Sequence, residues 1–318
     1  MLSVRGLRVL VELERRGTLA EAARALNYTP SAVSQQLAAL EREAGVALLT
    51  PVGRGVRLTD AGRMLAAHAH EIIGAIARAE TDLANLSYTV SGQVRVASFQ
   101  SVLLEVAPRA LALLADEHPD LDVVLFQRDV DDAHSGLLSH AFDLILGEEF
   151  DGHPQPPVPG VQREDLLTDP LWVALPSALA AQRAPRRLAD LADQPWALES
   201  SKTRMGRWAR TECFAAGFNP RIRSESTDPT LHMQLVASGL AVSFVPALFG
   251  ARLGRGIDVF ALAGADGAAP RRTLYTEVRD GQARHLAIRA VRSAFVAAAG
   301  GIPVHRTNGT IRTGMMDA

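Results

Sequence analysis

Three short helical patterns crowd into the first 45 residues or so, and this crowding limits what the N-terminal part can fold into. Apolar residues at helical spacing run up to Gly17, a residue type that commonly ends helices. Thr18 then caps a second helix, with Glu21 three residues later as in a capping box. Thr29 caps a third helix that has Pro30 at its first position. Helices this short, joined this tightly, predict a small three-helix module.

The third helix combines an apolar face with a polar beginning. Val33, Leu37 and Leu40 share its inward face, whereas hydroxyl and amide groups gather at its N-terminal end. In a helix-turn-helix the N-terminal residues of the second helix meet base edges in the major groove, where such groups can bond bases or phosphates. The alternative is an ordinary Ser-rich amphipathic helix. The DNA contacts that we expect from this helix are Thr29, Pro30, Ser31, Ser34 and Gln35.

A hairpin and a long helix follow. Two strand-like segments, 47–49 and 56–58, enclose a turn with one proline and two glycines. Thr59 then caps a helix that extends from 60 to about 87. Its apolar residues are spaced as in a coiled coil, and an apolar stripe on a lone helix requires a partner. The residues of this stripe are Leu65, Ile72, Ile76, Leu83 and Leu86.

Beyond Gly92 short β runs alternate with helical patterns, which predicts a parallel α/β sheet. The expected strands are 93–98, 121–127, 143–146, 172–175, 196–198, 222–225, 241–245 and 273–278. The expected helices include 102–117, 135–140 and 285–299, and 161–171 is expected to be a crossing segment. Residues 301–318 have no periodicity and are predicted to form a tail.

Composition excludes several classes of protein. A length of 318 residues with 47% hydrophobic residues suits more than one folded domain. The single cysteine, Cys213, excludes an internal disulfide and a thiolate zinc site, and no cofactor or metal is expected. No run approaches the roughly 20 apolar residues of a membrane span, so we expect a soluble, cytoplasmic protein. Residues 1–63 carry nine arginines against six acidic residues, a mildly basic balance.

The ordered set of motifs resembles the LysR family of bacterial transcription regulators. The resemblance is carried by Gly17–Ala23, by the segment TPSAVSQQLAAL at 29–40 and by GRGVRLTDAG at 53–62, and more weakly by FDLIL at 142–146 and GLAV at 239–242. It implies an α/β protein overall, with a winged helix-turn-helix at 1–59, a dimerising linker helix at 60–88 and an effector-binding domain at 92–300. That domain would fold like periplasmic binding proteins, in two α/β lobes of about 92–161 with 272–300, and 168–265.

The resemblance also implies partners. A homodimer or homotetramer would bind a pseudo-palindromic site on double-stranded DNA, a small-molecule effector would modulate it, and RNA polymerase is a further candidate partner. The hairpin would be a wing, with Arg54 and Arg57 on phosphates or in the minor groove. One departure is Pro51, which stands where the family usually has an arginine, so a phosphate contact is missing there.

In a two-lobed domain the turns from strand to helix are expected to face the cleft. Helix N-termini carry unpaired N–H groups and a partial positive charge, which favours an anionic effector. The alternative is that the hydroxyls in these turns are helix caps. The effector contacts that we expect are Ser98, Gln100, Ser101, Ser200, Ser201 and Thr227, with Lys202 as a counter-charge.

Three rival functions remain at this point. An enzyme is disfavoured because the sequence has no Gly-rich phosphate loop, nucleophile elbow or His/Asp/Glu cluster at ligand spacing. A solute-binding protein would have a secretory segment where this chain has a helix-turn-helix. A DNA-binding protein that has lost ligand sensing is the third. Cys213 is interpreted as a small core residue, with a thiol sensor as the weaker alternative.

Overall fold

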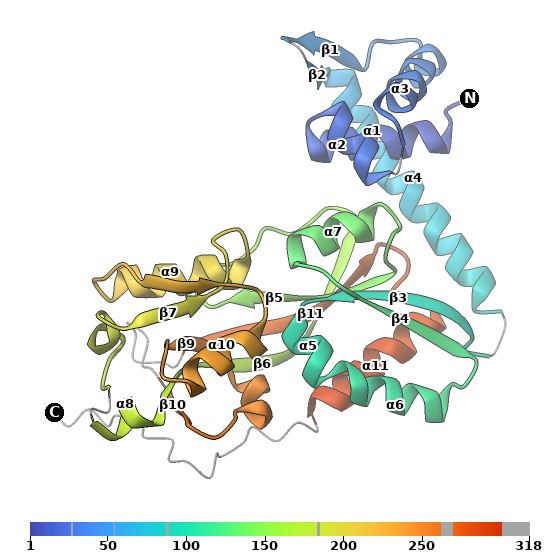
Figure 1. Ribbon diagram of the computed structural model, residues 1–318. Helices are drawn as coiled ribbons and strands as arrows, with labels where there is room; N and C mark the ends of the chain where they lie inside the picture. The colour runs from blue at the N-terminus through green and yellow to red at the C-terminus, as the bar shows by residue number, and fades with distance from the viewer. Residues whose placement is uncertain (27, 54, 87–88, 183–184, 262–269, 301–318) are drawn as a thin grey trace.

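The computed structural model (Figure 1) describes residues 1–26, 28–53, 55–86, 89–182, 185–261 and 270–300. An N-terminal module (residues 4–58) is joined by the long helix α4 to a two-lobed domain. The module contains α1 Val4–Arg16, α2 Leu19–Ala25, α3 Pro30–Ala44, β1 Leu49–Val52 and β2 Gly55–Leu58, and α4 is Asp60–Ala84. The predicted tail at 301–318 lies outside the described residues, as does the end of the predicted 168–265 lobe.

Local caps define the module as the sequence predicted. Gly17 ends α1 with a left-handed backbone (φ 75°), and its N–H donates to the Leu13 carbonyl at 2.9 Å. The hydroxyls of Thr18, Thr29 and Thr59 accept N–H groups at the starts of α2, α3 and α4. Behind these caps, one apolar core gathers residues from α1, α2, α3 and the start of α4, among them Leu10 and Leu37, which are buried.

Lobe one (residues 92–150 with 271–300) is an α/β layer structure. Its elements are β3 Gly92–Ser98, α5 Gln100–Glu105, α6 Ala107–Glu117, β4 Leu121–Gln127, α7 Val130–Leu138, β5 Leu144–Phe150, β11 Arg271–Arg279 and α11 Leu286–Gly300. Helices α6 and α11 cover one face of the sheet, and α7 covers the other (Figure 1). The predicted helix 102–117 is wrong: it is interrupted at Val106, because Pro108 in the first turn of α6 has no N–H to continue the helix.

Lobe two (residues 171–261) is smaller. Its elements are α8 Ser177–Gln182, η1 Leu188–Leu191, β7 Pro195–Leu198, α9 Arg204–Ala215, β8 Arg221–Glu225, α10 Pro229–Ala237, β9 Ser243–Pro246, η2 Ala247–Arg252 and β10 Ile257–Ala261. Trp196, Trp208 and Phe244 pack together in its core, with the Trp208 and Phe244 rings edge to face and the Trp196 ring tilted against Phe244.

One continuous strand passes from lobe one into lobe two. The expected crossing segment and the strand after it are one continuous strand, β6 Val161–Pro176. Its first half pairs with β11, and its second half pairs with β9 and β10. The prediction of a parallel sheet holds only for β3 with β4 and β5, and for β7 with β8. The crossing strands β6 and β11 are antiparallel, because a chain that leaves one lobe and returns must run in both directions.

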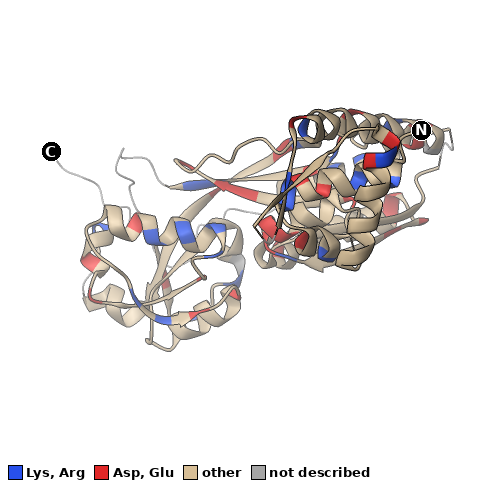
Figure 2. Ribbon diagram, turned by 90° about the horizontal axis from the view of Figure 1, so that it is seen from above, with Lys and Arg blue, Asp and Glu red and all other residues tan. Residues whose placement is uncertain are grey.

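The linker helix is shorter than predicted. It ends at Ala84, where Asn85 donates from its side chain to the Arg284 carbonyl at 2.9 Å and accepts the Leu286 N–H at 3.0 Å. Asn85 thus ends α4 and caps α11 in lobe one. Seen from above in Figure 2, the N-terminal module lies over lobe one and leaves lobe two uncovered.

Gly62 is required by a close approach in this module. A Cβ atom added there would lie 2.2 Å from the Leu48 carbonyl oxygen, which accepts the Thr59 N–H at 2.9 Å. We predict that Gly62→Ala lowers the free energy of unfolding by about 1–3 kcal/mol through overpacking. Gly55→Ala is the matched control, because its Cβ would meet only ordinary contact at 3.7 Å. Urea denaturation followed by circular dichroism measures both, and equal stability of the two variants would contradict the prediction.

Candidate functional site

The N-terminal end of α3 is a polar surface. Thr29, Pro30, Ser31, Ser34 and Gln35 are all exposed, whereas Val33, Leu37 and Leu40 on the other side of the helix are buried. Thr29 serves partly as a cap, since its Oγ1 accepts the Ala32 N–H at 3.2 Å and lies 3.0 Å from the Ser31 hydroxyl. The expected DNA contacts therefore share one solvent-facing surface on a helix that is anchored from behind.

The hairpin lies beside this surface as a two-stranded antiparallel ribbon. Arg57 is exposed and stands opposite Thr50, and Pro51 stands opposite Val56. Proline is tolerated here because β1 has no second neighbour that would need its N–H. The predicted contact Arg54 lies outside the described residues.

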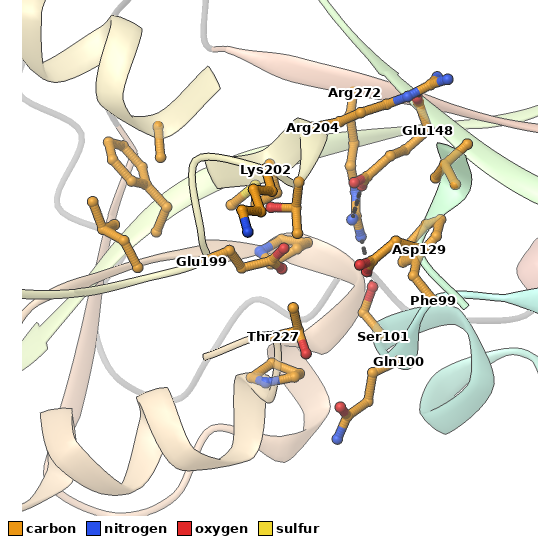
Figure 3. A pocket seen from close by; sticks show the side chains of 18 of the residues that line it. Phe99, Gln100, Ser101, Asp129, Glu148, Glu199, Lys202, Arg204, Thr227 and Arg272 are labelled. Carbon is orange, nitrogen blue, oxygen red and sulfur yellow. Dashed lines mark hydrogen bonds and ion pairs between the residues drawn. The ribbon is translucent and has the colours of Figure 1, made fainter. Parts of the chain in front are cut away.

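A cavity of about 480 Å³ lies between the two lobes (Figure 3). Four of the predicted effector contacts line it: Gln100, Ser101, Lys202 and Thr227. The other three are not among the residues that line it. Ser98 is buried at the end of β3. Ser200 lies in the turn before α9, where its carbonyl accepts the Thr203 hydroxyl, and Ser201 is exposed.

The wall of the cavity is organised around a buried arginine that sequence reasoning missed. Arg272 of β11 is 2% exposed and donates to Glu148 of β5 at 2.7 Å. It also donates to Asp169 of β6 at 2.7 and 2.9 Å, and to the Ser101 hydroxyl at 3.2 Å. Burial raises the pKa of both carboxyl groups, and the guanidinium between them opposes that shift. The sequence signal for this network was the presence of charged residues within each of the three strands β5, β6 and β11.

A second arginine connects the lobes. Arg204 begins α9 in lobe two, and its guanidinium donates to Asp131 of α7 in lobe one at 3.0 and 3.1 Å. It donates further to the Tyr275 hydroxyl at 2.8 Å and to the Glu148 carbonyl at 3.1 Å. The Tyr275 ring passes over Gly147, where an added Cβ would lie 2.4 Å from it. Glycine at this position leaves room for the ring whose hydroxyl accepts from Arg204.

Two more carboxyl groups face the cavity, Asp129 from lobe one and Glu199 from lobe two. Burial raises the pKa of Glu199 to about 8, and the charges of Glu148 and Asp129 add to the shift. Burial raises the pKa of Asp129 too, with Asp132 and Asp131 adding to it. Glu199 and Asp129 thus each have acidic neighbours, and like charges held close together disfavour the ionised form of each carboxyl group.

Comparison with known proteins identifies the chain. Residues 4–63 match the model of the bacterial regulatory helix-turn-helix protein, lysR family, and residues 89–300 match that of the LysR substrate binding domain. The chain belongs to the LysR family. It is a DNA-binding transcription regulator with an effector-binding domain, and not an enzyme. The first matched segment contains the α3 surface, and the second covers the two lobes that enclose the cavity.

Individual relatives of this LysR regulator agree with the assignment. The RuBisCO operon transcriptional regulator of Allochromatium vinosum is 31% identical over 76% of this chain and 79% of its own. The transcriptional dual regulator GltC of Bacillus subtilis is 26% identical over 77% and 81%. Among solved structures, a full-length OxyR variant from Pseudomonas aeruginosa has a TM-score of 0.62 at 19% identity, covering 96% of this chain and 97% of that one. CbnR complexed with its target DNA has a TM-score of 0.51 at 24% identity, covering 92% and 100%.

Other site types find no support in the part of the chain that the structure describes. There, no three His, Cys, Asp or Glu side chains are grouped so as to hold a metal ion. None of the described helices is long and apolar enough to cross a membrane. Cys213 is buried in the core of lobe two, and burial raises the pKa of its thiol to about 12, which disfavours the reactive thiolate.

The Arg272 network gives a prediction about stability. Arg272→Met leaves Glu148 and Asp169 buried without their cation, so we expect a loss of about 3–5 kcal/mol in the free energy of unfolding at pH 7.5. The unpaired carboxyl groups would then have still higher pKa values, so part of the loss should be recovered at pH 5, where they take up protons more readily. Thermal unfolding at the two pH values measures this.

The adjacent arginine is the control. Arg271 pairs with Asp151 at 3.2 Å, and each of these side chains is 53% exposed. Arg271→Met should change stability by less than about 1 kcal/mol, because exposed ion pairs contribute little. A loss in Arg272→Met that is no greater than in Arg271→Met, or that is independent of pH, would contradict the assigned role.

Proposed function

We propose that this regulator binds a pseudo-palindromic DNA site through α3 and the wing, as a homodimer or homotetramer, and that a small molecule in the cavity modulates the binding. The observation that carries the DNA-binding part is the exposed polar N-terminal surface of α3, which is held from behind by a buried apolar face. The exposed position of Arg57 on β2 supports a contact between the wing and a DNA phosphate. At a promoter, RNA polymerase is a further proposed partner, on the ground of the family alone.

The exposed side of α4 supports the oligomer. One side of this helix packs within its own chain, where Ala66 and Ala69 are buried. On another side Ile72 and Leu83 are 37% and 68% exposed, while Leu65 and Ile76 of the same stripe are half-buried. Apolar side chains aligned along a helix favour pairing with a second copy of the same stripe. Such pairing would present two α3 helices to the two halves of one DNA site.

Helix α7 supports a route from the cavity to the N-terminal module. At its N-terminal end Asp131 binds Arg204 of lobe two beside the cavity. Near its middle the carbonyls of His134 and Ser135 each accept from Arg15 of α1 at 3.4 Å. Glu12 holds Arg15 in place. A change in the angle between the lobes would therefore act on the helix that contacts the N-terminal module.

Two classes of substitution separate base reading from phosphate binding. Ser34→Ala and Gln35→Ala should each reduce the discrimination between the regulator's own upstream DNA and random DNA by about 1–3 kcal/mol. Arg57→Ala should weaken binding to both DNAs and make the slope of log K against log salt shallower by about 0.9. Fluorescence anisotropy at several salt concentrations measures both effects. Equal loss on both DNAs in all three variants would contradict the assignment of α3 as the reading helix.

The oligomer is tested on α4. Glutamate at positions 72 and 83 (Ile72→Glu with Leu83→Glu) should shift the protein toward the monomer and weaken binding to the full DNA site, because charges would be buried at the paired stripe. Ala67→Glu is the control, since Ala67 is exposed about half a helical turn away. Light scattering after size-exclusion chromatography measures the mass. An unchanged mass in the double variant would place the dimer interface elsewhere.

A further inference from the structure

Two of the four cations in the cavity wall, Arg204 and Arg272, are matched by acids of the protein, whereas Arg128 and Lys202 form no ion pair among the described residues. Arg272 lies between Glu148 and Asp169, and Arg204 binds Asp131. Both arginines are almost completely buried. An anionic ligand would have to compete with fixed carboxylates for these two guanidinium groups. Their part in the site is to hold the strands and lobes together.

Asp129 and Glu199 are different, because neither forms an ion pair within the described part of the chain. Asp129 comes from lobe one at the start of α7, and Glu199 follows β7 in lobe two. In the view of Figure 3 their carboxyl groups point toward one another across the cavity. Glu199 hydrogen-bonds Thr203, and its charge interacts with that of Asp129. Two carboxyl groups without ion-pair partners therefore face each other from the two lobes.

Acidic groups predominate around this pair, and the one cation beside Asp129 in the lining, Arg128, is exposed and forms no ion pair among the described residues. Glu148 adds negative charge near Glu199, and Asp131 and Asp132 add it near Asp129. Arg272 acts on Glu199 in the opposite direction, but it is held by its own two acids. Lys202 is exposed at the edge of the cavity and forms no ion pair with either acid among the described residues.

A buried side chain in the wall also lacks a partner. His232 is 5% exposed, and its Nε2 atom has no hydrogen-bond partner among the residues that the structure describes. Burial lowers its pKa, so the ring is neutral near pH 7 and adds no positive charge to the cavity. A buried polar atom without a partner costs free energy, which a polar ligand in the cavity would recover.

We propose that the ligand of this cavity is a small organic cation whose ammonium or guanidinium group binds between Glu199 and Asp129. This inference rests on the proposed ligand role of the cavity, and it replaces the expectation of an anion. The cation favours the ionised form of Glu199, offsets the repulsion that then arises between the two carboxylates, and bonds to one acid from each lobe. It thereby favours the closed arrangement of the lobes, whereas a carboxylate in the same place would add negative charge to a site already lined by acids.

Isothermal titration calorimetry on the full chain tests the charge class. The probes are agmatine and L-arginine as cations and succinate as the anion, each at pH 7 and pH 8.5. We expect both cations to bind and succinate not to bind. Glu199→Gln and Asp129→Asn should each weaken agmatine binding about tenfold or more, since each removes a charged hydrogen-bond acceptor. Asp116→Asn on α6 makes the same charge change at an exposed position outside the cavity and should leave the affinity unaltered.

Proton release provides a second readout. Because the pKa of Glu199 is raised to about 8, its carboxyl group holds a proton in the empty cavity at pH 7 and must lose it when the cation binds. Titrations in buffers of different ionisation enthalpy should show this release at pH 7 and less of it at pH 8.5. Agmatine should bind more tightly at the higher pH, by up to about tenfold per pH unit below pH 8. Glu199→Gln should abolish the proton release while thermal unfolding reports that it remains folded.

Different results would overturn the two proposals. Binding of succinate without binding of either cation overturns the cation but keeps a ligand in the cavity. Binding of neither cation, or agmatine binding that is equal in Glu199→Gln, Asp129→Asn and Asp116→Asn, also overturns it. The DNA-binding part of the proposed function fails only if the anisotropy measurements show no preference for specific DNA, a result on which the calorimetry has no bearing.

Discussion

The two-lobed domain depends on one buried cation. Arg272 lies on the return strand β11, and its guanidinium binds Glu148 on β5, Asp169 on β6 and Ser101 at the start of α5. Asp169 in turn accepts the Leu248 N–H at 2.8 Å, which brings η2 of lobe two into the same network. Buried ion pairs add little net stability compared with apolar packing, but they are costly to break. Such a centre fixes where the crossing strands meet, and hence where the cavity lies.

The same centre determines which charges of the cavity remain for a ligand. Because Arg272 and Arg204 are each bound by acids of the protein, they serve as structural cations. Asp129 and Glu199 have no such partner in the described structure, and burial makes the negative charge of Glu199 costly. The family determines that the cleft receives an effector, but the distribution of paired and unpaired charge in this chain determines its sign. The partial positive charges at the helix N-termini, which suggested an anion, are smaller than the full charge of an ionised carboxyl group.

Local signals and distant contacts differ in how well sequence predicts them. Gly17, Thr18, Thr29 and Thr59 were assigned correctly because a cap involves residues within one turn. Gln100 and Ser101 line the cavity as expected, but Ser98, two residues earlier, points into the protein at the end of its strand. The Arg272 network escaped prediction because its partners lie 103, 124 and 171 residues away in sequence. No periodicity reports which strands will be neighbours, and the antiparallel return of β11 was missed for the same reason.

Helix α7 shows why ionic contacts suit a regulator at this position. Its nine residues span about 14 Å as a single rigid element, so a displacement of its N-terminal end moves the whole helix. Its N-terminal end begins beside Asp129 and binds lobe two through Asp131, and carbonyls near its middle accept hydrogen bonds from Arg15 of the N-terminal module. Apolar packing at these two contacts would resist sliding in any direction, whereas a few hydrogen bonds from long arginine side chains can re-form after a small rotation. A cation that pulls Asp129 toward Glu199 therefore changes the position of the helix on which the N-terminal module rests.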